Sequence, residues 1–599
     1  MLDLTPRTTD AALIADLCQQ LAANGANAEL NTIIARILAG RGVVDTAELR
    51  LELGALQPAA GLKGLEAAVA LLDAAIDGQK QILIVGDFDC DGATSTALMV
   101  RVLREMGARV DFLVPDRFKY GYGLTPPIVE LGIARFAPEV IVTVDNGIVS
   151  YAGVDFAKAR GIEVIITDHH LTTQNAPAAD AVVNPNQLGC HFASKALVGV
   201  GVAFYVLGNL AKIRRAAGKS SAQVSRYLDL VALGTVADVG VLDHNNRILV
   251  HYGLQAIRAG RCCVGILALL EQAGRDARQI TAQDFGFIIA PRINAAGRME
   301  DMRIGIECLL ADDWGTAQQL AHQLDALNRQ RRQVEQHMRQ QADGLLYDIR
   351  QHAPTRHASS SSHLRSLVLY QDDWHQGVIG IVAGRLKEAY HVPAIVFAPA
   401  DVNAVGDDDA IKGSARSIAG IHIRDMIERI AEAQPDLISH FGGHAMAAGL
   451  TLPKRNFAAF KTAFDSLMGE LPPDTFSETL YSDGALPVAA FDVRFVQYLH
   501  NLTIWGHGFA APVFDGVFVV QDYRVLKERH VKLWLCPADS PTTLSLEAIW
   551  FNADFDQLAL RQIARGISRV QVLYALDDNA YNGQHRVQLM VKKIALVLV

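Results

Sequence analysis

Residues 82–107 read ILIVGDFDCDGATSTALMVRVLREMG, the pattern of a β-strand followed by an α-helix. A short apolar, β-branched run leads directly into three aspartates and then into an amphipathic segment. Similar apolar runs recur further on, at ARVDFLV (108–114), VIVTV (140–144) and VIIT (164–167). Most of them precede a helix-like segment. Alternation of this kind predicts a parallel α/β sheet whose strands are buried on both faces.

The composition narrows the class of protein. The chain has 599 residues, with 50% hydrophobic and 20% charged, which excludes extensive disorder and predicts about three to five domains. The net charge of -9 means that any nucleic-acid surface must be local. Seven cysteines without a CxxC pair argue against a secreted disulfide scaffold and a structural zinc site. We find no signal peptide and no apolar run of about 18–20 residues, so we expect a cytoplasmic protein.

The hydrophobic pattern divides the chain into five regions. Residues 1–75 form a helical N-terminal region, and 76–315 the first α/β domain. A long connecting helix follows over 316–350, where apolar residues at spacings of three, four and seven form one stripe. A second α/β domain spans 351–465, and it begins with the polar stretch HAPTRHASSSSH (352–363), which we interpret as a loop at the domain boundary. Residues 466–599 are rich in alternating strands, which predicts a small barrel or sandwich.

Acidic and imidazole groups follow three of the predicted strands. Asp87, Asp89 and Asp91 come just after the strand at 82–85. Asp145 follows the strand at 140–144, and the run 168–170 (Asp168, His169 and His170) follows the strand at 164–167. Because the carboxyl ends of parallel strands meet at one edge of the sheet, these side chains converge on one crevice.

Such a cluster is suited to divalent cations. Crowded carboxylates repel and raise one another's pKa values, and a cation relieves that repulsion. Carboxylate oxygens with one or two imidazoles suit Mn²⁺ or Mg²⁺. A carboxylate that bridges two ions about 3.5–4 Å apart builds a phosphoester hydrolase site.

Two structural alternatives apply to the first acidic motif. An aspartate after a strand often caps the next helix, and Asp87 taken alone fits that interpretation equally well. The run DFDCDG also resembles the start of a calcium loop. The residues that follow, ATSTALMV, provide no glutamate at the twelfth position, and a buried strand precedes the motif, so we set the calcium loop aside.

Several motifs resemble those of the DHH phosphoesterase superfamily. They are GDFDCDG (86–92), VDNGI (144–148), DHH (168–170) and VADVGVL (236–242). Three further segments resemble those of its bacterial single-strand-specific exonucleases, namely PRINAAGRM (291–299), KGSARS (412–417) and SHFGGHAMAAGL (439–450). GGHAMAAG is typical of the associated DHHA1-type second domain. The similarity covers roughly residues 50–599, with the motifs in the expected order.

The resemblance implies roles for the clustered residues. Asp89 and Asp145 hold one metal ion. The other ion is held by Asp91, Asp145, His169 and Asp238, so that Asp145 bridges the two. Asp87 and Asp168 are auxiliary ligands, and His170 faces the substrate phosphate or the leaving group. Many relatives carry a histidine where this chain has Val85. We therefore expect Asp87 or a water molecule to serve as a ligand of the first ion in its place.

Substrate binding is expected to come from basic and polar residues outside the acidic cluster. The candidates are Arg117, Tyr122, Arg292, Arg298, Ser414, Arg416 and His444. Guanidinium groups between small-residue turns, such as those at Gly413 and Gly442-Gly443, suit phosphate binding. Alternatively, each arginine pairs with a local acid. The resemblance implies that these segments line a groove between the two α/β domains and hold the 5′ phosphate.

The resemblance predicts a metal-dependent 5′→3′ exonuclease that degrades single-stranded DNA to 5′-mononucleotides in recombinational and mismatch repair. It implies single-strand-binding protein and a RecQ-type helicase as partners. The C-terminal strands resemble an OB-fold barrel, whose aromatic residues we expect to be mostly core. One alternative is a phosphodiesterase of the same superfamily acting on short oligonucleotides or small molecules, although such enzymes lack the barrel. Another is a non-catalytic DNA-binding scaffold, although every expected carboxylate is present.

Overall fold

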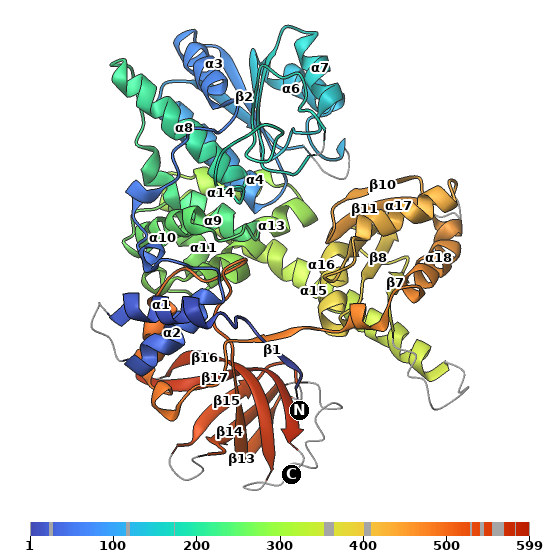
Figure 1. Ribbon diagram of the computed structural model, residues 1–599. Coiled ribbons are helices and arrows are strands. Elements are labelled where there is room, and N and C mark those ends of the chain that lie inside the picture. The colour runs from blue at the N-terminus through green and yellow to red at the C-terminus, as the bar shows by residue number, and fades with distance from the viewer. Residues whose placement is uncertain are drawn as a thin grey trace. The chain divides into compact units, whose positions relative to one another are not determined.

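The computed structural model describes residues 2–22, 28–115, 120–172, 174–352, 364–400, 409–527, 530–539, 544–553, 568–581 and 583–597. They form two compact units (Figure 1). The first comprises Met1–Ile293, Met302–Ala321 and Thr479–Val599, and the second comprises Asn294–Asp301 and His322–Glu478. Arg117 and residues 353–363 of the loop predicted over 352–363 lie outside the described residues, while His352 is the last residue of a helix.

The first unit contains the predicted parallel sheet. Its strand order is β3-β2-β4-β5-β6, and all neighbours are parallel. The strands are β2 (Gln81–Gly86), β3 (Arg109–Leu113), β4 (Val140–Val144), β5 (Glu163–Thr167) and β6 (Ala181–Val183). Helices α6 (Pro126–Phe136) and α7 (Tyr151–Lys158) lie on one side of this sheet, and α3 (Leu65–Asp77) and α8 (Gly199–Ala216) lie on the other (Figure 1). The strands are apolar throughout because both faces are covered.

A helical layer follows the sheet in the first unit. It contains α4 (Cys90–Glu105), α9 (Leu228–Ala237), α10 (His244–Arg258), α11 (Val264–Gln272) and α14 (Arg303–Leu310). A π-helical turn at Phe285–Ile289 runs directly into α13 (Ala290–Met299). The N-terminal region is helical as predicted, with α1 (Ala11–Ala22) and α2 (Ala28–Ala39), but it also contains the short strand β1 (Leu4–Pro6). β1 pairs in parallel with β12 (Leu480–Ser482), a contact that no local pattern predicts.

The C-terminal strands close into a barrel with the order β13-β14-β15-β17-β16. The strands are β13 (Phe514–Leu526), β14 (His530–Pro537), β15 (Leu546–Trp550), β16 (Arg569–Tyr581) and β17 (Gln584–Val597), and α19 (Val493–Asn501) precedes them. Closure of the sheet removes its exposed edges. This confirms the barrel, and its first strand begins at Phe514.

The second unit is built on a mixed sheet with the order β10-β11-β9-β8-β7. The strands are β7 (Leu367–Tyr370), β8 (Ala394–Pro399), β9 (Ala410–Arg416), β10 (His440–Gly443) and β11 (Ala447–Pro453). Only the β7–β8 pair is parallel among the described strands of this sheet. Helices α17 (Ile423–Ala433) and α18 (Phe457–Gly469) cover one apolar core, and α16 (Ile379–Tyr390) belongs to another.

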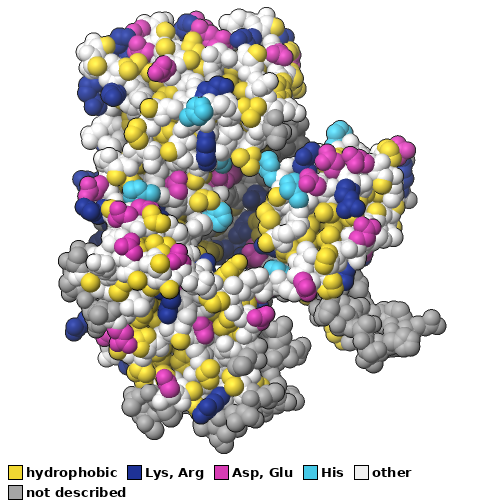
Figure 2. Space-filling model, viewed as in Figure 1, with side chains coloured by type: hydrophobic (Ala, Val, Ile, Leu, Met, Phe, Trp, Pro, Cys, Tyr) yellow, Lys and Arg dark blue, Asp and Glu magenta, His cyan; other side chains and the backbone are white. Residues whose placement is uncertain are grey.

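The predicted long helix is α15 (Trp314–His352). Its buried side chains include Leu324 and Met338 of the predicted stripe. No helix among the described residues is both long and apolar enough to span a membrane. Figure 2 shows Lys and Arg side chains interspersed with Asp and Glu side chains on the visible face, as expected of a chain without a global basic field.

Candidate active site

Backbone N–H groups fix two aspartates at the start of α4. Asp89 is the N-cap of α4, and its Oδ1 accepts a hydrogen bond from the N–H of Asp91 at 2.9 Å. The fully buried Asp91 accepts from Gly199 N at 2.6 Å and from Val200 N at 2.9 Å, at the start of α8. A carboxylate stabilises a helix N-terminus by accepting from its unpaired N–H groups. The helix-cap interpretation considered for Asp87 therefore applies to Asp89, while Asp91 caps a helix distant in sequence.

Asp145 follows β4 and has a left-handed backbone, with a φ of 62°. Its N–H donates to Thr167 O at 3.0 Å, so the residue still pairs with the neighbouring strand β5. Gly199 leaves space for its side chain, because a Cβ at residue 199 would lie 2.6 Å from Asp145 Cβ and 2.7 Å from Asp145 Oδ1. The close approach of α8 to this carboxylate thus requires a glycine.

Asp168 is buried, and backbone N–H groups of nearby residues donate hydrogen bonds to its carboxylate. Its Oδ2 accepts from Ile148 N at 2.9 Å, and its Oδ1 accepts from His169 N at 2.7 Å and His170 N at 3.0 Å. His170 Nδ1 lies 2.7 Å from the same Oδ1. Burial alone would raise the pKa of Asp168, but the hydrogen bond and charge of His170 outweigh it and lower the pKa. The carboxylate therefore positions both histidines.

His170 is a strong candidate for a cationic donor. Burial works against its charged form, yet the hydrogen bond to Asp168 outweighs burial and raises the pKa of His170 to about 9. Both ring nitrogens lie 3.3 Å from the Tyr122 hydroxyl. Burial and the nearby carboxylates raise the pKa of Tyr122 well above its ordinary value, so this hydroxyl keeps its proton.

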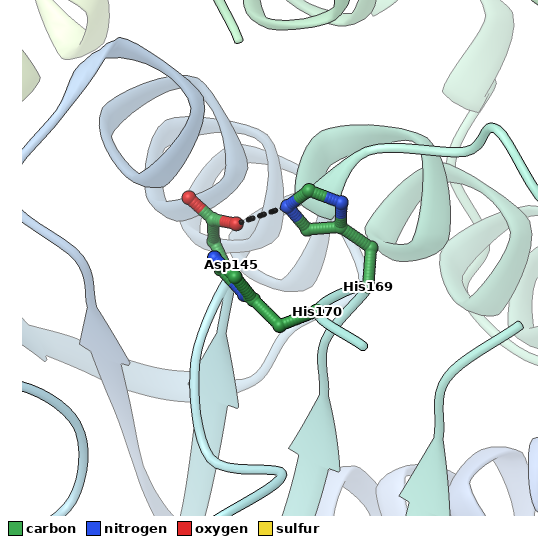
Figure 3. Close-up of side chains that lie close together, drawn as sticks. All are labelled: Asp145, His169 and His170. Carbon is green, nitrogen blue, oxygen red and sulfur yellow. Dashed lines mark ion pairs between the residues drawn. The ribbon is translucent and has the colours of Figure 1, made fainter. Parts of the chain in front are cut away.

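His169 contrasts with its neighbour because it is neutral at pH 7. Burial and the charge of His170 lower the pKa of His169 to about 4. Its Nε2 lies 3.1 Å from Asp145 Oδ1 and 3.6 Å from Asp238 Oδ2. Figure 3 shows the His169 ring directed at the Asp145 carboxylate. A neutral imidazole beside carboxylates is the form that binds a metal ion.

Asp238 comes from a helix end rather than from a strand. It is the C-cap residue of α9, and the turn that follows is a Schellman motif. In this motif Val239 N donates to Val236 O at 3.2 Å, and Gly240 N donates to Thr235 O at 3.1 Å. Val239 has a φ of 55°, a left-handed conformation that a β-branched residue rarely adopts. Strain of this kind is concentrated at functional sites.

The clustered carboxylates destabilise one another's charges. Burial, followed by the charge of Asp89, raises the pKa of Asp91. Burial and the other aspartates, Asp91 first, likewise raise the pKa values of Asp145 and Asp238. The cluster therefore carries excess negative charge that a cation would neutralise.

The ligand atoms fall into groups of the size that metal ions need. Asp87, Asp89 and Asp145 offer oxygens that all lie within 4.8 Å of one another. The same holds for Asp91, His169 and Asp238, and also for Asp145 with His169 and His170. Asp145 Oδ1 and His169 Nε2 are buried and have no hydrogen-bond partner among the described residues. Oxygen-rich donors, two orphaned ligand atoms and a shared Asp145 fit two divalent cations.

Val85 is a core residue rather than part of this cluster. Its side chain belongs to the apolar cluster that also includes Leu113 and Leu124. The position that a histidine takes in many relatives is thus apolar here, and Asp87 is the additional oxygen donor grouped with Asp89 and Asp145.

The sequence analysis missed two asparagines that hold the histidine pair. Asn184 Nδ2 donates to His170 O at 3.0 Å, and Asn186 Nδ2 donates to His169 O at 2.6 Å. Both follow the short strand β6 in the run NPN. The only local signal was their place after a strand on the same sheet edge as the aspartates.

Four of the substrate-binding candidates lie in the second unit. Arg416 Nη1 donates to Ser414 Oγ at 3.0 Å and to Ala415 O at 2.8 Å. Both side chains pack on the first turn of α16, since a Cβ at Gly380 would lie 2.9 Å from Arg416 Nη2 and 3.0 Å from Ser414 Oγ.

Arg298 adjoins the same helix start, because its Nη1 donates at 3.3 Å to the carbonyl of Gly377, just before α16. The exposed His444 lies in the β10–β11 hairpin, where its N–H donates to Ala447 O at 2.8 Å. Arginines beside a helix N-terminus suit a phosphate.

The structure corrects the expectation that these groups lie in small-residue turns. Arg292 and Arg298 lie on α13, and Arg416 lies on β9. Gly413 is also within β9, where an added Cβ would lie 2.5 Å from Phe397 Cε1. This glycine therefore makes room for an aromatic ring rather than for an anion. Arg292 is buried in the first unit, where its Nη1 donates to Ile288 O of the π-helical turn at 2.7 Å.

The C-terminal aromatic residues are core, as expected for most of them. Phe509, Phe514 and Tyr574 are buried. On the barrel, Lys532 of β14 pairs with Glu547 of β15 at 2.8 Å.

Three family models match the parallel-sheet domain, the mixed-sheet domain and the C-terminal barrel. Residues 81–235 match the DHH family, N-terminal domain, residues 364–470 match the DHHA1 domain, and residues 482–593 match the RecJ OB domain. These matches cover the acidic cluster except Asp238, the cluster around α16 except Arg298, and the barrel.

Relatives are similar over almost the whole chain. The single-stranded-DNA-specific exonuclease RecJ of Escherichia coli K12 is 44% identical over 95% of this chain and 96% of its own length. The crystal structure of Thermus thermophilus RecJ with Mn²⁺ matches with a TM-score of 0.77 at 29% identity, covering 100% of this chain and 79% of that one. The corresponding Mg²⁺ complex matches with a TM-score of 0.72 at 28% identity, covering 99% and 77%. The chain therefore belongs to the RecJ family of single-stranded-DNA-specific exonucleases.

Proposed function

We propose that the chain is a metal-dependent 5′→3′ exonuclease that degrades single-stranded DNA to 5′-mononucleotides. The observation that carries this proposal is the position of Asp145, which is grouped with Asp87 and Asp89 and also with His169, the histidine that is itself grouped with Asp91 and Asp238. Family membership supports the substrate class, because the relatives are named for activity on single-stranded DNA.

The residues divide between two Mn²⁺ or Mg²⁺ ions. Asp87, Asp89 and Asp145 would hold one ion, and Asp91, His169, Asp238 and Asp145 would hold the other. When bound, two divalent cations activate a water molecule and neutralise charge on the attacking and departing oxygens. The helix start of α8 and the N–H of Asp91 hold the carboxylates in place before any ion binds.

His170 would act on the phosphate directly. With a pKa of about 9 it carries protons on both nitrogens at pH 7, so one hydrogen bond goes to Asp168 while the other N–H faces substrate. The neutral hydroxyl of Tyr122 adds a second donor beside it. Hydrolysis breaks the bond between the phosphorus and the 3′ oxygen of the terminal nucleotide, which leaves a 5′ phosphate on the next one.

The arginines would bind the 5′ end of the DNA strand. Arg298, Ser414 and Arg416, together with the N-terminus of α16 and His444, form the proposed 5′-phosphate subsite. Charge-assisted hydrogen bonds and helix-end N–H groups favour a terminal phosphate. Arg117 and Arg292 stay predicted contacts of the substrate strand or its 5′ phosphate.

The cellular role is proposed on the same basis. We assign the enzyme to recombinational and mismatch repair in the cytoplasm, where DNA is its substrate. Single-strand-binding protein and a RecQ-type helicase would deliver single strands to it.

The proposal is tested with single- and double-stranded DNA labelled at either end, in Mn²⁺, in Mg²⁺ and in EDTA. We expect 5′-labelled strands to release labelled mononucleotide first, only when single-stranded and only with metal. Cleavage confined to a short oligonucleotide would favour a small-substrate phosphodiesterase. Binding of DNA without any cleavage would favour a scaffold.

A further inference from the structure

A loop from the C-terminal part of the chain packs on the turn that carries Asp238. We call residues 503–510 the buttress loop. Leu242 N donates to His507 O in this loop at 2.8 Å. The two segments touch closely on either side of this bond, because a Cβ at Gly506 would lie 2.6 Å from Leu242 Cδ1, and one at Gly508 would lie 2.6 Å from Val241 Cγ1.

Two stacked aromatic rings of the buttress loop each contact an arginine from another segment. The Arg247 guanidinium lies 3.9 Å from the centre of the Phe509 ring, which stacks on Trp505 at 5.4 Å. The guanidinium of Arg41 lies 5.5 Å from the centre of the Trp505 ring. Stacking between guanidinium groups and aromatic faces is favourable when both are desolvated.

Both arginines attach this stack to the surrounding structure. Arg41 makes two hydrogen bonds to Asp483, at 2.5 and 2.9 Å, and donates to Ala510 O at 2.7 Å. Arg247 belongs to α10, the helix that begins directly after the turn of residues 238–243. The loop and the turn are therefore fixed to the same scaffold.

The turn has a physical need for such support. Val239 holds a left-handed conformation, and both Val239 (61% exposed) and Val241 (42% exposed) are largely open to solvent. Close by in the sequence, the buried Asn246 of α10 supports the backbone of the turn, because its Nδ2 donates to Val241 O at 2.8 Å. The buttress loop, more than 260 residues further along the sequence, adds the contacts at the Val241 side chain, the Leu242 side chain and the Leu242 N–H.

We propose that the buttress loop is a positioning element that sets Asp238 for metal binding. This inference rests on the proposed function, in which Asp238 is a ligand. Outer groups that orient a ligand typically change metal affinity by about 10–100-fold. Because the loop lies in the C-terminal part, a chain truncated near residue 470 would lose support for the metal site as well as the barrel.

The test is a glycine substitution with a matched control. Gly508→Ala puts a methyl group against Val241 at a position with a φ of 72°. Gly583→Ala imposes the same backbone strain, with a φ of 76°, but meets nothing within 4 Å. We expect Gly508→Ala to bind one of two Mn²⁺ ions about tenfold more weakly in calorimetric titration of the metal-free chain, and Gly583→Ala to bind both ions normally.

A second substitution asks whether the contact itself is responsible. Val241→Ala removes the atom at 2.6 Å and leaves a Cβ contact at 3.3 Å, so the double variant Gly508→Ala/Val241→Ala should regain most of the lost affinity. Val241→Ala alone completes the double-mutant cycle. Equal losses in Gly508→Ala and in the double variant would overturn the positioning role.

Hydrogen exchange of the unmodified chain provides a test that does not depend on any variant folding. Since linkage is reciprocal, Mn²⁺ should slow exchange of the Leu242 amide and of residues 503–510. Unchanged exchange in this loop on Mn²⁺ binding would contradict the inference. If the wild-type chain binds no Mn²⁺, the proposed function fails; if it does and Gly508→Ala binds equally well, only the positioning role fails.

Discussion

The acidic cluster of the first unit differs from the arginine cluster of the second unit, Arg298 and Arg416, in the groups that surround its charged side chains. At the edge of the first sheet, buried aspartates crowd together, and burial and mutual repulsion raise the pKa values of Asp91, Asp145 and Asp238. Around α16, Arg416 and Arg298 donate to neutral oxygens of Ser414, Ala415 and Gly377. The first cluster carries more carboxylates than its single cationic side chain, His170, can balance, whereas the second presents guanidinium groups.

This difference assigns hydrolysis to the acidic cluster and recognition of the DNA end to the arginine cluster. A set of strained, repelling carboxylates gains most from cations and supplies the ligands of a hydrolytic site. Guanidinium groups beside a helix N-terminus suit an anion such as a phosphate. The acidic cluster should therefore control turnover on every substrate, while the arginine cluster should control which strand ends are used.

The largest effect is expected from Asp145→Asn, which tests the acidic side of the comparison. Loss of the shared carboxylate should reduce nucleotide release at least about a thousandfold, because two-ion catalysis supplies several kcal/mol. Binding of single strands, followed by fluorescence anisotropy in EDTA, should persist. Asp111→Asn on the same sheet, whose carboxylate accepts from Gln81 at 2.9 Å, is the control. Turnover of Asp145→Asn within tenfold of wild type would refute the shared-ligand assignment.

Arg416→Ala tests the arginine cluster. Hydrogen bonds to charged groups are worth about 1.5–3 kcal/mol, so kcat/KM on 5′-phosphorylated strands should fall roughly 10–150-fold. On 5′-hydroxyl strands the loss should be much smaller, since the interaction is absent. Both substrates are compared at one ionic strength. Arg424→Ala, which breaks only an i,i+4 pair with Glu428, serves as the matched control. Equal losses on the two substrates would mean that Arg416 grips the strand generally.

The Asp168–His170 pair gives the acidic edge a pH signature. His170 has a folded pKa of about 9, above its unfolded value near 6.5, so its pairing stabilises the protein fully below about pH 6.5 and is lost as pH rises through 9. Asp168→Asn removes the partner charge. The stability advantage of the metal-free wild type over Asp168→Asn should therefore shrink between pH 6 and 9.5. Thermal denaturation across that range measures it, and a constant difference would contradict the assignment.

The smallest effect is expected at the turn after α9. Val239→Gly places a glycine at the left-handed position of the Schellman motif, where glycine is usual. Relief of strain, partly offset by the backbone entropy of glycine, should stabilise the metal-free chain by about 1 kcal/mol, since the lost side chain is exposed. Urea denaturation measures the change. A destabilised variant would show that the Val239 side chain makes a contact that matters.

The sequence predicts the acidic edge well because its rule is local. A strand followed at once by aspartate places the carboxylate at the strand's end, and parallel pairing gathers Asp91, Asp145 and His169 at one edge. Asp238 lies at a helix end, so only the resemblance could assign it. The aspartate that caps α4 is Asp89 rather than Asp87. Which of them is the cap depends on the residue at which the helix starts, and local patterns do not fix helix ends that closely.

Other features are invisible to local patterns because they depend on distant contacts. Gly413 resembles a turn residue in sequence but is placed within β9 by Phe397 of the neighbouring strand. Arg292 lies on a helix because the π-helical turn before it absorbs an extra residue ahead of Pro291. The contact of His507 with Leu242 joins segments that no spacing rule connects.

Anomalous diffraction from crystals grown with Mn²⁺ is the most direct test of the central claim that Asp145 joins two metal sites. We predict two manganese peaks about 3.5–4 Å apart. One should lie beside Asp87 and Asp89, the other beside Asp91, His169 and Asp238, and the Asp145 carboxylate should contact both. A single peak at saturating Mn²⁺, or two peaks of which Asp145 contacts only one, would contradict the account.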